Sequence, residues 1–242
     1  MTSIVYTYKK LNTKVYEKDT NQKEWIKQSI ESARKLNYIL ELYTNDLEFS
    51  EGLDLDKVHI IDDDYRIWDS FKIWVLENRK DDDYFLSDSD VIFNKKIPFD
   101  NNIDIYFDGI EIQNWNRGYA LTMKFLKSKG ISDKIEFWSY DKKPVYNVGI
   151  LKINNQKLKS DYIKYWKILY SEVLPHIESL NDIFITPIIT QYLLTLLVNN
   201  THSTYDYFTK KSQWPYNNNF YNHFAGFLKF KNENIIRGEY LL

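Results

Sequence analysis

The chain has 242 residues, of which 43% are hydrophobic and 17% aromatic, so it can bury a large core and fits one domain better than two. Its 32 Lys and Arg residues nearly balance 34 Asp and Glu residues, and the formal net charge of -2 excludes an overall basic field for a nucleic-acid backbone. Cysteine is absent, which excludes disulfides and thiolate metal sites and leaves His and carboxylates as side-chain metal ligands.

The first half of the chain alternates short apolar runs with longer periodic ones, a pattern typical of βα units around a largely parallel sheet. The short runs predict strands at Ser3 to Tyr8, Ile39 to Thr44 and Lys57 to Ile61. The periodic runs predict amphipathic helices at Lys23 to Asn37 and Ile67 to Asn78. The acidic group Asp62 to Asp64 can cap the start of the second helix.

The second half continues the α/β pattern without an internal repeat or a domain boundary. Strands are expected at Asp104 to Phe107 and Val145 to Ile153, and helices at Leu158 to Ser179 and Pro187 to Asn199. Thr186 is the expected N-cap of the last helix, with Pro187 as its first residue. Residues 200–222 are rich in Asn, Tyr, Ser and Thr, and we predict that they form an irregular segment before the apolar residues His223 to Phe230.

Neither a leader nor a membrane span is expected. Met1 to Tyr8 lacks a charged region followed by a long apolar stretch, and the apolar run Ile183 to Val198 is broken by Thr, Pro and Gln. We therefore expect a soluble, cytoplasmic protein without a transmembrane segment.

Asp88 and Asp90 are the most informative residues, because they follow the apolar run 84–86 where a buried strand is expected to reach the edge of the sheet. Their spacing of two places both side chains on one face of a strand, or lets a turn aim both at one ion. Oxygen ligands of this kind suit Mg²⁺ or Mn²⁺, and open α/β sheets bind ligands at the carboxyl ends of their strands. The alternative is that the strand simply ends in polar turn residues.

Late in the chain, His223, Gly226 and Lys229 recur three residues apart. An imidazole can complete a carboxylate metal site, a glycine permits close approach of the backbone to a phosphate, and a lysine supplies a positive point charge. Together they suit a metal-bound diphosphate. Taken singly, each has a simpler interpretation as a core or surface histidine, a turn glycine and a solvated strand lysine.

Between these motifs, Asn147 and Gly149 interrupt an otherwise apolar strand. Glycine inside a strand marks a close approach of a backbone or a ligand, or a β-bulge. Asn147 can hydrogen-bond a sugar hydroxyl, and the β-bulge is the structural alternative.

In this order, the three segments resemble glycosyltransferase family 8, the glycogenin-like and lipopolysaccharide galactosyltransferase group. The Asp-x-Asp motif of that family is similar to Asp88-Ser89-Asp90, its Asn-x-Gly strand to Asn147-Val148-Gly149, and its His-x-x-Gly-x-x-Lys to residues 223–229. The ordered match runs from about residue 4 to residue 230. The chain also resembles small viral glycosyltransferases of the same GT-A type, which would place it in the host cytoplasm.

The resemblance implies a single GT-A (Rossmann-like) domain over residues 1–242, with a nucleotide-binding half at 1–93 and an acceptor half at 94–242. It implies a UDP-sugar donor, a glycan or other hydroxyl acceptor, and a Mn²⁺ or Mg²⁺ ion held by Asp88, Asp90 and His223. The ion would stabilise the leaving diphosphate. The donor-binding residues that the resemblance implies are Tyr6, Thr7, Tyr8, Lys72, Asp88, Ser89, Asn147, Gly149, Gly226 and Lys229.

Two of these assignments follow the family's plan only loosely. Residues 6–8 end the first predicted strand, where the family seats the nucleotide base and an aromatic face can stack on uracil; core tyrosines are the alternative. Lys72 lies about one position from the family's basic residue in the helix before Asp-x-Asp. The family's Asp-Gln pair is replaced by Ile185-Thr186-Pro187, with Asp182 earlier and Gln191 later, which leaves a retaining outcome open.

If the reaction inverts the sugar's configuration, a carboxylate must deprotonate the acceptor hydroxyl. Asp108 and Glu111 are the candidates, because they follow a predicted strand shortly after the metal motif; turn carboxylates are the alternative. An aromatic stacking surface for an acceptor sugar, or part of the core, is expected from Trp115, Trp138 and Trp214.

Three other functions compete with glycosyl transfer. A haloacid-dehalogenase-like phosphatase uses an Asp-x-Asp such as Asp88 and Asp90, but its motif normally opens the domain, whereas here about 80 residues precede it. A sugar nucleotidyltransferase needs a glycine-rich N-terminal phosphate loop, and no glycine precedes Gly52. A non-catalytic sugar-binding module would not need a metal triad.

Overall fold

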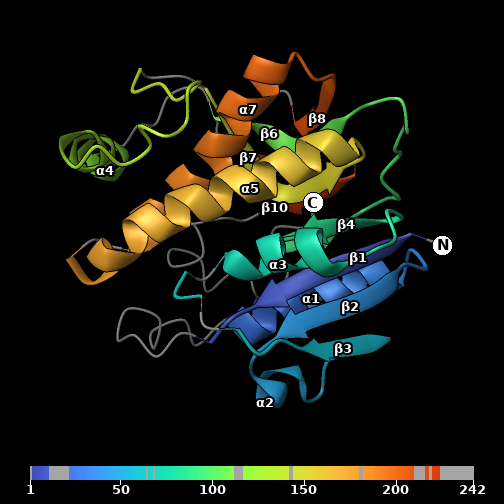
Figure 1. Cartoon of the computed structure of the whole chain (residues 1–242). Coiled ribbons are helices and arrows are strands. Elements are labelled where there is room, and N and C mark those ends of the chain that lie inside the picture. Colours follow the sequence, from blue (N-terminus) through green and yellow to red (C-terminus); the bar gives the residue numbers. More distant parts are fainter. Residues whose placement is uncertain are drawn as a thin grey trace.

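A seven-stranded sheet organises the chain in the computed structural model (Figure 1). The structure describes residues 2–10, 22–63, 65–67, 69–111, 117–141, 144–179, 182–209, 216–217 and 220–223. In spatial order the strands are β3 (Lys57–Ile60), β2 (Ile39–Thr44), β1 (Ser3–Tyr8), β4 (Tyr84–Ser87), β7 (Val145–Ile153), β6 (Ile105–Glu111) and β8 (Tyr205–Thr209).

Most neighbouring strands of this sheet are parallel. The strands β3, β2, β1 and β4 run in one direction, and β6 is parallel to β8, whereas β7 is antiparallel to both of its neighbours. The predicted α/β fold with a mixed, mostly parallel sheet is therefore confirmed. A separate small sheet has the order β5 (Val91–Phe93), β10 (Tyr221–His223) and β9 (Tyr216–Asn217).

Helices cover both faces of the large sheet, because alternate residues of each strand point to opposite faces (Figure 1). Ile4 and Tyr6 of β1 pack on the side of α1 (Gln22–Arg34), whereas Val5 packs on the side of α3 (Ser70–Asn78). The other helical segments are α2 (Leu47–Ser50), α4 (Arg117–Ser128), α5 (Gln156–Val173), the 3₁₀ helix η1 (Leu174–Ser179), α6 (Asp182–Pro187), the π-helical turn η2 (Ile188–Tyr192) and α7 (Leu193–Thr201).

The helix α1 shows why these segments fold as they do. Its Trp25, Ile26, Ile30 and Ala33 are buried at spacings of one, three and four residues, so one stripe of the helix faces the sheet. Burying each large apolar side chain contributes roughly 1.5–3 kcal/mol. Ile30→Ala would therefore remove about 2–5 kcal/mol from the free energy of unfolding.

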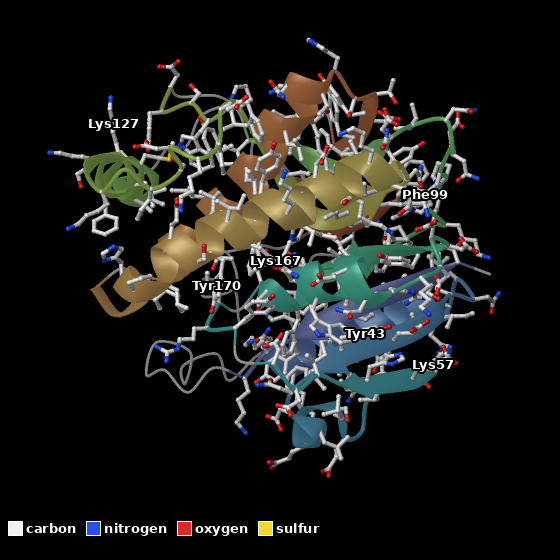
Figure 2. All side chains as sticks on the ribbon, viewed as in Figure 1. Tyr43, Lys57, Phe99, Lys127, Lys167 and Tyr170 are labelled. Atoms are coloured by element: carbon white, nitrogen blue, oxygen red, sulfur yellow. The ribbon has the colours of Figure 1, made fainter. Side chains whose placement is uncertain are left out.

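On the opposite face, polar contacts join α5 to the α3 segment. Lys167 of α5 forms an ion pair with Glu77 of α3, and the Tyr170 hydroxyl accepts a hydrogen bond from the Arg66 backbone N–H at 2.9 Å. Figure 2 shows Lys167 and Tyr170 along α5, and Tyr43 beside α3, where its ring lies 5.9 Å from that of Trp74. These contacts hold the helix that precedes Asp88 against the sheet.

Several predicted boundaries are confirmed, and one helix start differs. The strands Ile39–Thr44 and Val145–Ile153 have the predicted bounds. The helix α3 begins at Ser70 instead of Ile67, with Asp69 at its N-cap position. Within the predicted acidic group, Asp63 is ion-paired with Lys9 at 2.5 Å and does not cap the helix, whereas Asp64 lies outside the described residues.

The predictions for the last third of the chain need two corrections. Thr186 does not cap a helix, and Pro187 does not begin one; both lie in α6, which starts at Asp182 and continues through η2 into α7. The widened turn η2 follows directly after Pro187, whose missing N–H interrupts the ladder of helical hydrogen bonds. Residues 200–222 are not simply irregular, because they contain β8, β9 and the first residues of β10.

Across the ranges that the structure covers, none of the helices combines the length and the apolar character needed to cross a membrane.

Candidate functional site

The Asp-x-Asp motif lies at the point where the strand order of the sheet reverses. From β1 the chain proceeds to β2 and β3 on one side, and then returns to place β4 on the other side of β1. Ligands of open α/β sheets bind outside the carboxyl ends of the strands at such a switch point. Ser87 is the last residue of β4, so Asp88 and Asp90 stand at this crevice.

Strand pairing brings the late histidine to the motif. The Asp88 backbone N–H donates to the Gly149 carbonyl at 2.7 Å, and the chain then turns into β5. The strand β10 pairs antiparallel with β5 and places His223 opposite Val91, one residue after Asp90. The predicted convergence of the two aspartates and His223 is therefore a consequence of the β5–β10 pair.

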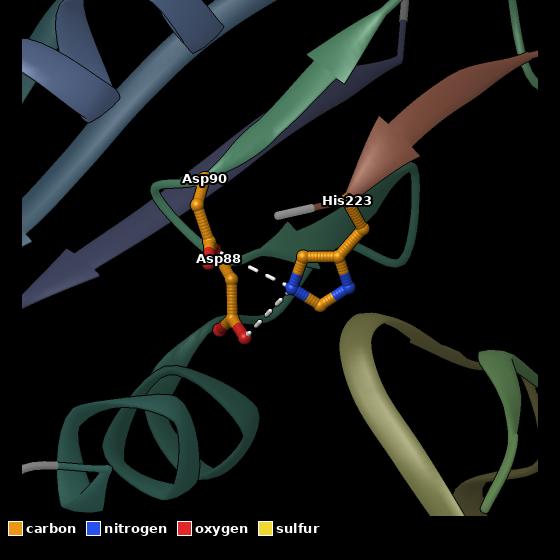
Figure 3. Close-up of side chains that lie close together, drawn as sticks. All are labelled: Asp88, Asp90 and His223. Atoms are coloured by element: carbon orange, nitrogen blue, oxygen red, sulfur yellow. Dashed lines mark ion pairs between the residues drawn. The ribbon is translucent and has the colours of Figure 1, made fainter. Parts of the chain in front are cut away.

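The three side chains point toward one another (Figure 3). The Nε2 atom of His223 lies 3.4 Å from Oδ1 of Asp90 and 3.7 Å from Oδ2 of Asp88, and one ligand atom from each residue falls within 4.8 Å of the others. Adjacent ligands of an octahedral Mg²⁺-sized ion are about 3 Å apart, so only a small contraction would be needed. His223 and Asp90 are buried, whereas Asp88 is partly exposed and open to a ligand.

The donor set suits a divalent cation of the Mn²⁺ or Mg²⁺ class. Carboxylate oxygens favour hard cations, and one imidazole nitrogen extends the choice toward transition metals such as Mn²⁺. The arrangement therefore fits the ion that the family resemblance implies, with Asp88, Asp90 and His223 as its protein ligands.

Lys72 of α3 contacts the same motif. Its Nζ donates to Oδ1 of Asp88 at 2.5 Å and lies 3.2 Å from Oδ1 of Asp69, and it also donates to the Val148 carbonyl at 3.3 Å. Burial opposes the charge of Lys72, but Asp69 and Asp88 outweigh this effect and raise the pKa of the ammonium group. Lys72 is therefore a buried permanent cation that partly neutralises Asp88.

Among the residues that the structure describes, negative charge is in excess around the motif. Asp69, Asp88, Asp90 and Asp108 face the cations Lys72 and, when protonated, His223. Burial lowers the pKa of His223, but Asp108 and Asp90 outweigh burial and raise it to about 10. Buried charges need partners, so a bound cation would complete the compensation, and the proton on His223 would have to leave when a metal takes its place.

Asp108 does not occupy the position of a catalytic base. It lies inside β6 and not after a strand, its side chain is 0% exposed, and both of its oxygens are engaged. Oδ1 accepts from the Tyr221 hydroxyl at 2.6 Å, and Oδ2 contacts Nδ1 of His223. An acceptor hydroxyl has no access to a carboxylate so enclosed, and the prediction of Asp108 as a base is wrong.

Glu111 ends β6 opposite Val145, so it too belongs to the strand instead of following it. Its side chain lies outside the described part of the structure, and its role as a base stays a prediction.

The Asn147-Val148-Gly149 segment leaves space for the side chain of His223. A Cβ atom on Gly149 would stand 2.0 Å from Cε1 of the His223 ring, so only glycine leaves room for the imidazole. The Asn147 side chain is buried, and its Oδ1 accepts from the Gly149 N–H at 2.8 Å. Both residues therefore shape the protein side of the site, and their direct contacts with the donor stay a prediction.

The β-bulge that was the structural alternative for this segment is present. Leu151 of β7 pairs with Phe107 of β6, and Asn147 pairs with Gly109, so residues 148–150 of β7 face Asp108 alone. The bulge places Gly149 beside Cε1 and Asp108 beside Nδ1 of the His223 ring.

The predicted nucleotide-base residues are only partly available. Tyr6 is 0% exposed and its hydroxyl is hydrogen-bonded to that of Ser29 at 2.9 Å, so its ring is a core residue and the stacking prediction is wrong for it. Tyr8 is half-buried and stacks on Phe49 with ring centroids 3.5 Å apart, while Thr7 is half-buried at the end of β1. A contact of Thr7 or Tyr8 with a base stays a prediction.

The remaining predicted residues are placed as follows. Ser89 is partly exposed between the two aspartates. Trp138 is half-buried and packs edge-on against Tyr192, with ring centroids 5.5 Å apart, so it contributes to the core. Gly226, Lys229, Trp115 and Trp214 lie outside the described residues.

Two contributors to this site were not predicted: Asp69, and Tyr221 with its hydrogen bond to Asp108. One signal for the contact between Tyr221 and Asp108 was available in the sequence. Asp108 is a polar residue inside an apolar strand and is followed by Gly109, as is typical of a close approach by another segment.

Comparisons with known proteins give structural neighbours only. No protein-family model matches the chain, and no curated protein matches it. The structure aligns with the glycosyltransferase GlyE of Streptococcus pneumoniae TIGR4 at TM-score 0.45 and 13% identity, covering 86% of this chain and 45% of that one. It aligns with the galactosyltransferase LgtC, in complex with donor and acceptor sugar analogs, at TM-score 0.41 and 14% identity, covering 86% and 73%.

A third neighbour is mouse xyloside xylosyltransferase 1, at TM-score 0.44 and 11% identity, covering 86% of this chain and 85% of that one. The chain spans less than half the length of GlyE. At this level of similarity, the function has to be inferred from the site itself.

Proposed function

We propose that this chain is a metal-dependent glycosyltransferase of the GT-A type, which transfers a sugar from a nucleotide-sugar donor, a UDP-sugar, to a hydroxyl of a glycan or another acceptor. The observation that carries the proposal is the convergence of Asp88, Asp90 and His223 at the switch point of the sheet. A diphosphate needs a divalent cation and an open side, and the partly exposed Asp88 supplies that side.

Each residue has a defined task in this proposal. Asp88 and Asp90 provide oxygen ligands and His223 a nitrogen ligand, so that a bound cation can neutralise the charge that develops on the leaving diphosphate. Lys72 maintains positive charge beside Asp88. Gly226 and Lys229, which follow His223 by three and six residues, are assigned to the phosphates.

The nucleotide is assigned to the half of the chain up to residue 93, with Thr7 and Tyr8 near the base and Ser89 near the donor. The acceptor is assigned to the half that begins at residue 94. Because Asp108 is enclosed, Glu111 remains the candidate base for an inverting reaction.

The burial of Asp90 argues against the phosphatase alternative. Such an enzyme would use Asp88 as its nucleophile and Asp90 as the acid that protonates the leaving group. Asp90 is 2% exposed and lies against His223, which favours a ligand over a proton donor to substrate. A sugar-binding module without catalysis would not require the buried excess of carboxylates.

The decisive test is the joint effect of nucleotide and metal on thermal stability. We expect UDP and Mn²⁺ together to raise Tm more than the sum of their separate effects, because both bind only the folded state and each improves the site of the other. A ligand at 100 times its Kd stabilises by about 2.7 kcal/mol. UDP without Mn²⁺, and Mn²⁺ with adenosine in place of UDP, are the controls.

If UDP fails to bind by calorimetry and no joint effect is seen, the proposal is wrong. A separate screen tests UDP-, GDP- and dTDP-sugars for metal-dependent hydrolysis. Hydrolysis of one of them identifies the donor, whereas no hydrolysis of any of them contradicts the enzyme class.

A further inference from the structure

A buried carboxylate behind the histidine has no task in the proposed reaction. Asp108 belongs to β6, two strands away from β4 in the sheet, and it is separated from the Asp-x-Asp motif by the His223 ring. It touches the imidazole on the side opposite the two aspartates, because its contact is to Nδ1 whereas theirs is to Nε2.

We infer that Asp108 is a positioning residue, which orients His223 and selects the tautomer whose Nε2 lone pair faces Asp88 and Asp90. The inference rests on the proposed metal site and deepens it. Asp108 itself touches neither the ion nor the donor.

The chemistry of imidazole supports this role. A neutral imidazole carries one N–H and one lone pair, and the hydrogen bond made by one nitrogen decides which form the other takes. A carboxylate beside Nδ1 accepts a hydrogen bond from the Nδ1–H group and so leaves Nε2 as the unprotonated atom. Metal-binding histidines commonly use a carboxylate in this way, and loss of that partner costs about 10–100-fold in metal affinity.

Three elements fix the ring in the required plane. Oδ2 of Asp108 holds Nδ1, the bulge at Gly149 of β7 leaves space for Cε1, and the pairing of β10 with β5 sets the backbone of His223. Asp108 is held in turn, because its Oδ1 accepts from the Tyr221 hydroxyl at 2.6 Å. Tyr221 and His223 are two apart on β10, so both side chains lie on the face of that strand that meets β6.

The burial of Asp108 separates positioning from general stabilisation. A carboxylate that is 0% exposed is costly to bury, and a stability role alone would be met as well by a neutral acceptor. A charged carboxylate at Nδ1 also raises the basicity of the imidazole toward a metal, which a neutral amide does far less.

The test measures Mn²⁺ affinity directly, from the electron paramagnetic resonance signal of free Mn²⁺, with no turnover required. We expect Asp108→Asn to bind Mn²⁺ about 10–100-fold more weakly than the wild type, and Tyr221→Phe to weaken binding by a smaller factor. The matched control is Glu41→Gln, which also neutralises a carboxylate that is 3% exposed but lies away from the site, and it should leave Mn²⁺ affinity unchanged.

A second measurement on the unmodified protein does not depend on a variant that folds. With ¹⁵N-labelled histidine and a diamagnetic cation bound, either Mg²⁺ or Zn²⁺, we expect the His223 proton on Nδ1 and an unprotonated Nε2. A proton on Nε2 would overturn the inference, as would wild-type Mn²⁺ affinity in a folded Asp108→Asn. Failure of the wild type to bind Mn²⁺ at all would instead overturn the proposed metal site.

Discussion

Two clusters of buried charge lie beside the large sheet, and they differ in how their charges are balanced. In the first, the Glu41 cluster, Glu41 accepts from Ser3 at 3.0 Å, from two N–H groups of Arg79 at 3.1 Å each, and contacts Nε2 of His59 at 3.1 Å. Burial raises the pKa of Glu41, but Arg79, Ser3 and His59 together hold it below its usual value. The Glu41 cluster therefore needs nothing from outside the chain.

In the second cluster, of Asp69, Asp88, Asp90 and Asp108 with Lys72 and His223, the described carboxylates outnumber the described cations. Burial raises the pKa of Asp69, and the proximity of Asp88 adds to that increase against the opposing effect of Lys72. Buried charge alone therefore does not indicate a functional site. An excess of one sign, with a partly exposed member such as Asp88, is the feature that points to a cation.

The largest expected effect is on metal-dependent binding. Asp90→Ala and His223→Ala should each abolish Mn²⁺-dependent binding of UDP in calorimetry while circular dichroism shows the fold retained, because each removes one of three proposed ligands. Glu41→Gln should show the reverse result, with binding kept and the free energy of unfolding lowered by about 3–5 kcal/mol, since Arg79 loses a buried partner. Normal binding by His223→Ala would exclude the three-ligand site.

A smaller effect is expected at the glycine beneath the histidine. Gly149→Ala puts a Cβ 2.0 Å from the imidazole, so the ring must move, and we expect weaker Mn²⁺ binding and a loss of about 1–3 kcal/mol from overpacking. In the His223→Ala background the same change should cost much less stability, because the clash is gone. Urea unfolding of the four proteins in this cycle measures the coupling, and additive costs would show that Gly149 serves something other than the ring.

A further effect is expected in the pH dependence of stability, where the two clusters have opposite signs. The pKa of Glu41 is lowered, so its contribution is present above about 4.5 and is lost as the pH falls through its folded-state pKa. The pKa of His223 is raised to about 10, so in metal-free protein its contribution is complete below 6.5 and is lost as the pH rises through about 10.

Urea unfolding across pH, with Glu41→Gln and His223→Gln beside the wild type, measures these two contributions. Each variant should flatten one end of the profile. If His223→Gln leaves the alkaline end as steep as in the wild type, the imidazolium is not a stabilising charge in the metal-free protein.

Local pattern was enough to predict much of the sheet and the three converging side chains. The runs Ile39–Thr44 and Val145–Ile153 are short and mostly apolar, so their lengths can be predicted from the residue types. Asp88 and Asp90 were predictable as candidate ligands because they directly follow β4, and His223 because its spacing to Gly226 and Lys229 resembles a known motif.

What could not be predicted depends on contacts between distant segments. The β10 strand lies in a polar, Tyr-rich stretch and exists through its pairing with β5, so residues 221–223 carry little strand signal of their own. Asp108 appeared as a catalytic base because its partner His223 is 115 positions away in the chain. Tyr6 appeared as a ligand residue because alternation alone does not reveal which face of β1 meets α1.

The position of His223 in the chain also determines when the site can form. Because β10 supplies the histidine, a nascent chain has its two aspartates long before it has the third proposed ligand. The cluster closes only after the ends of a loop more than 100 residues long have met. Until then Asp108 lacks both Tyr221 and His223. Metal uptake during refolding would therefore report the docking of β10. A divalent cation should bind late in refolding, and it should slow the unfolding of the completed protein.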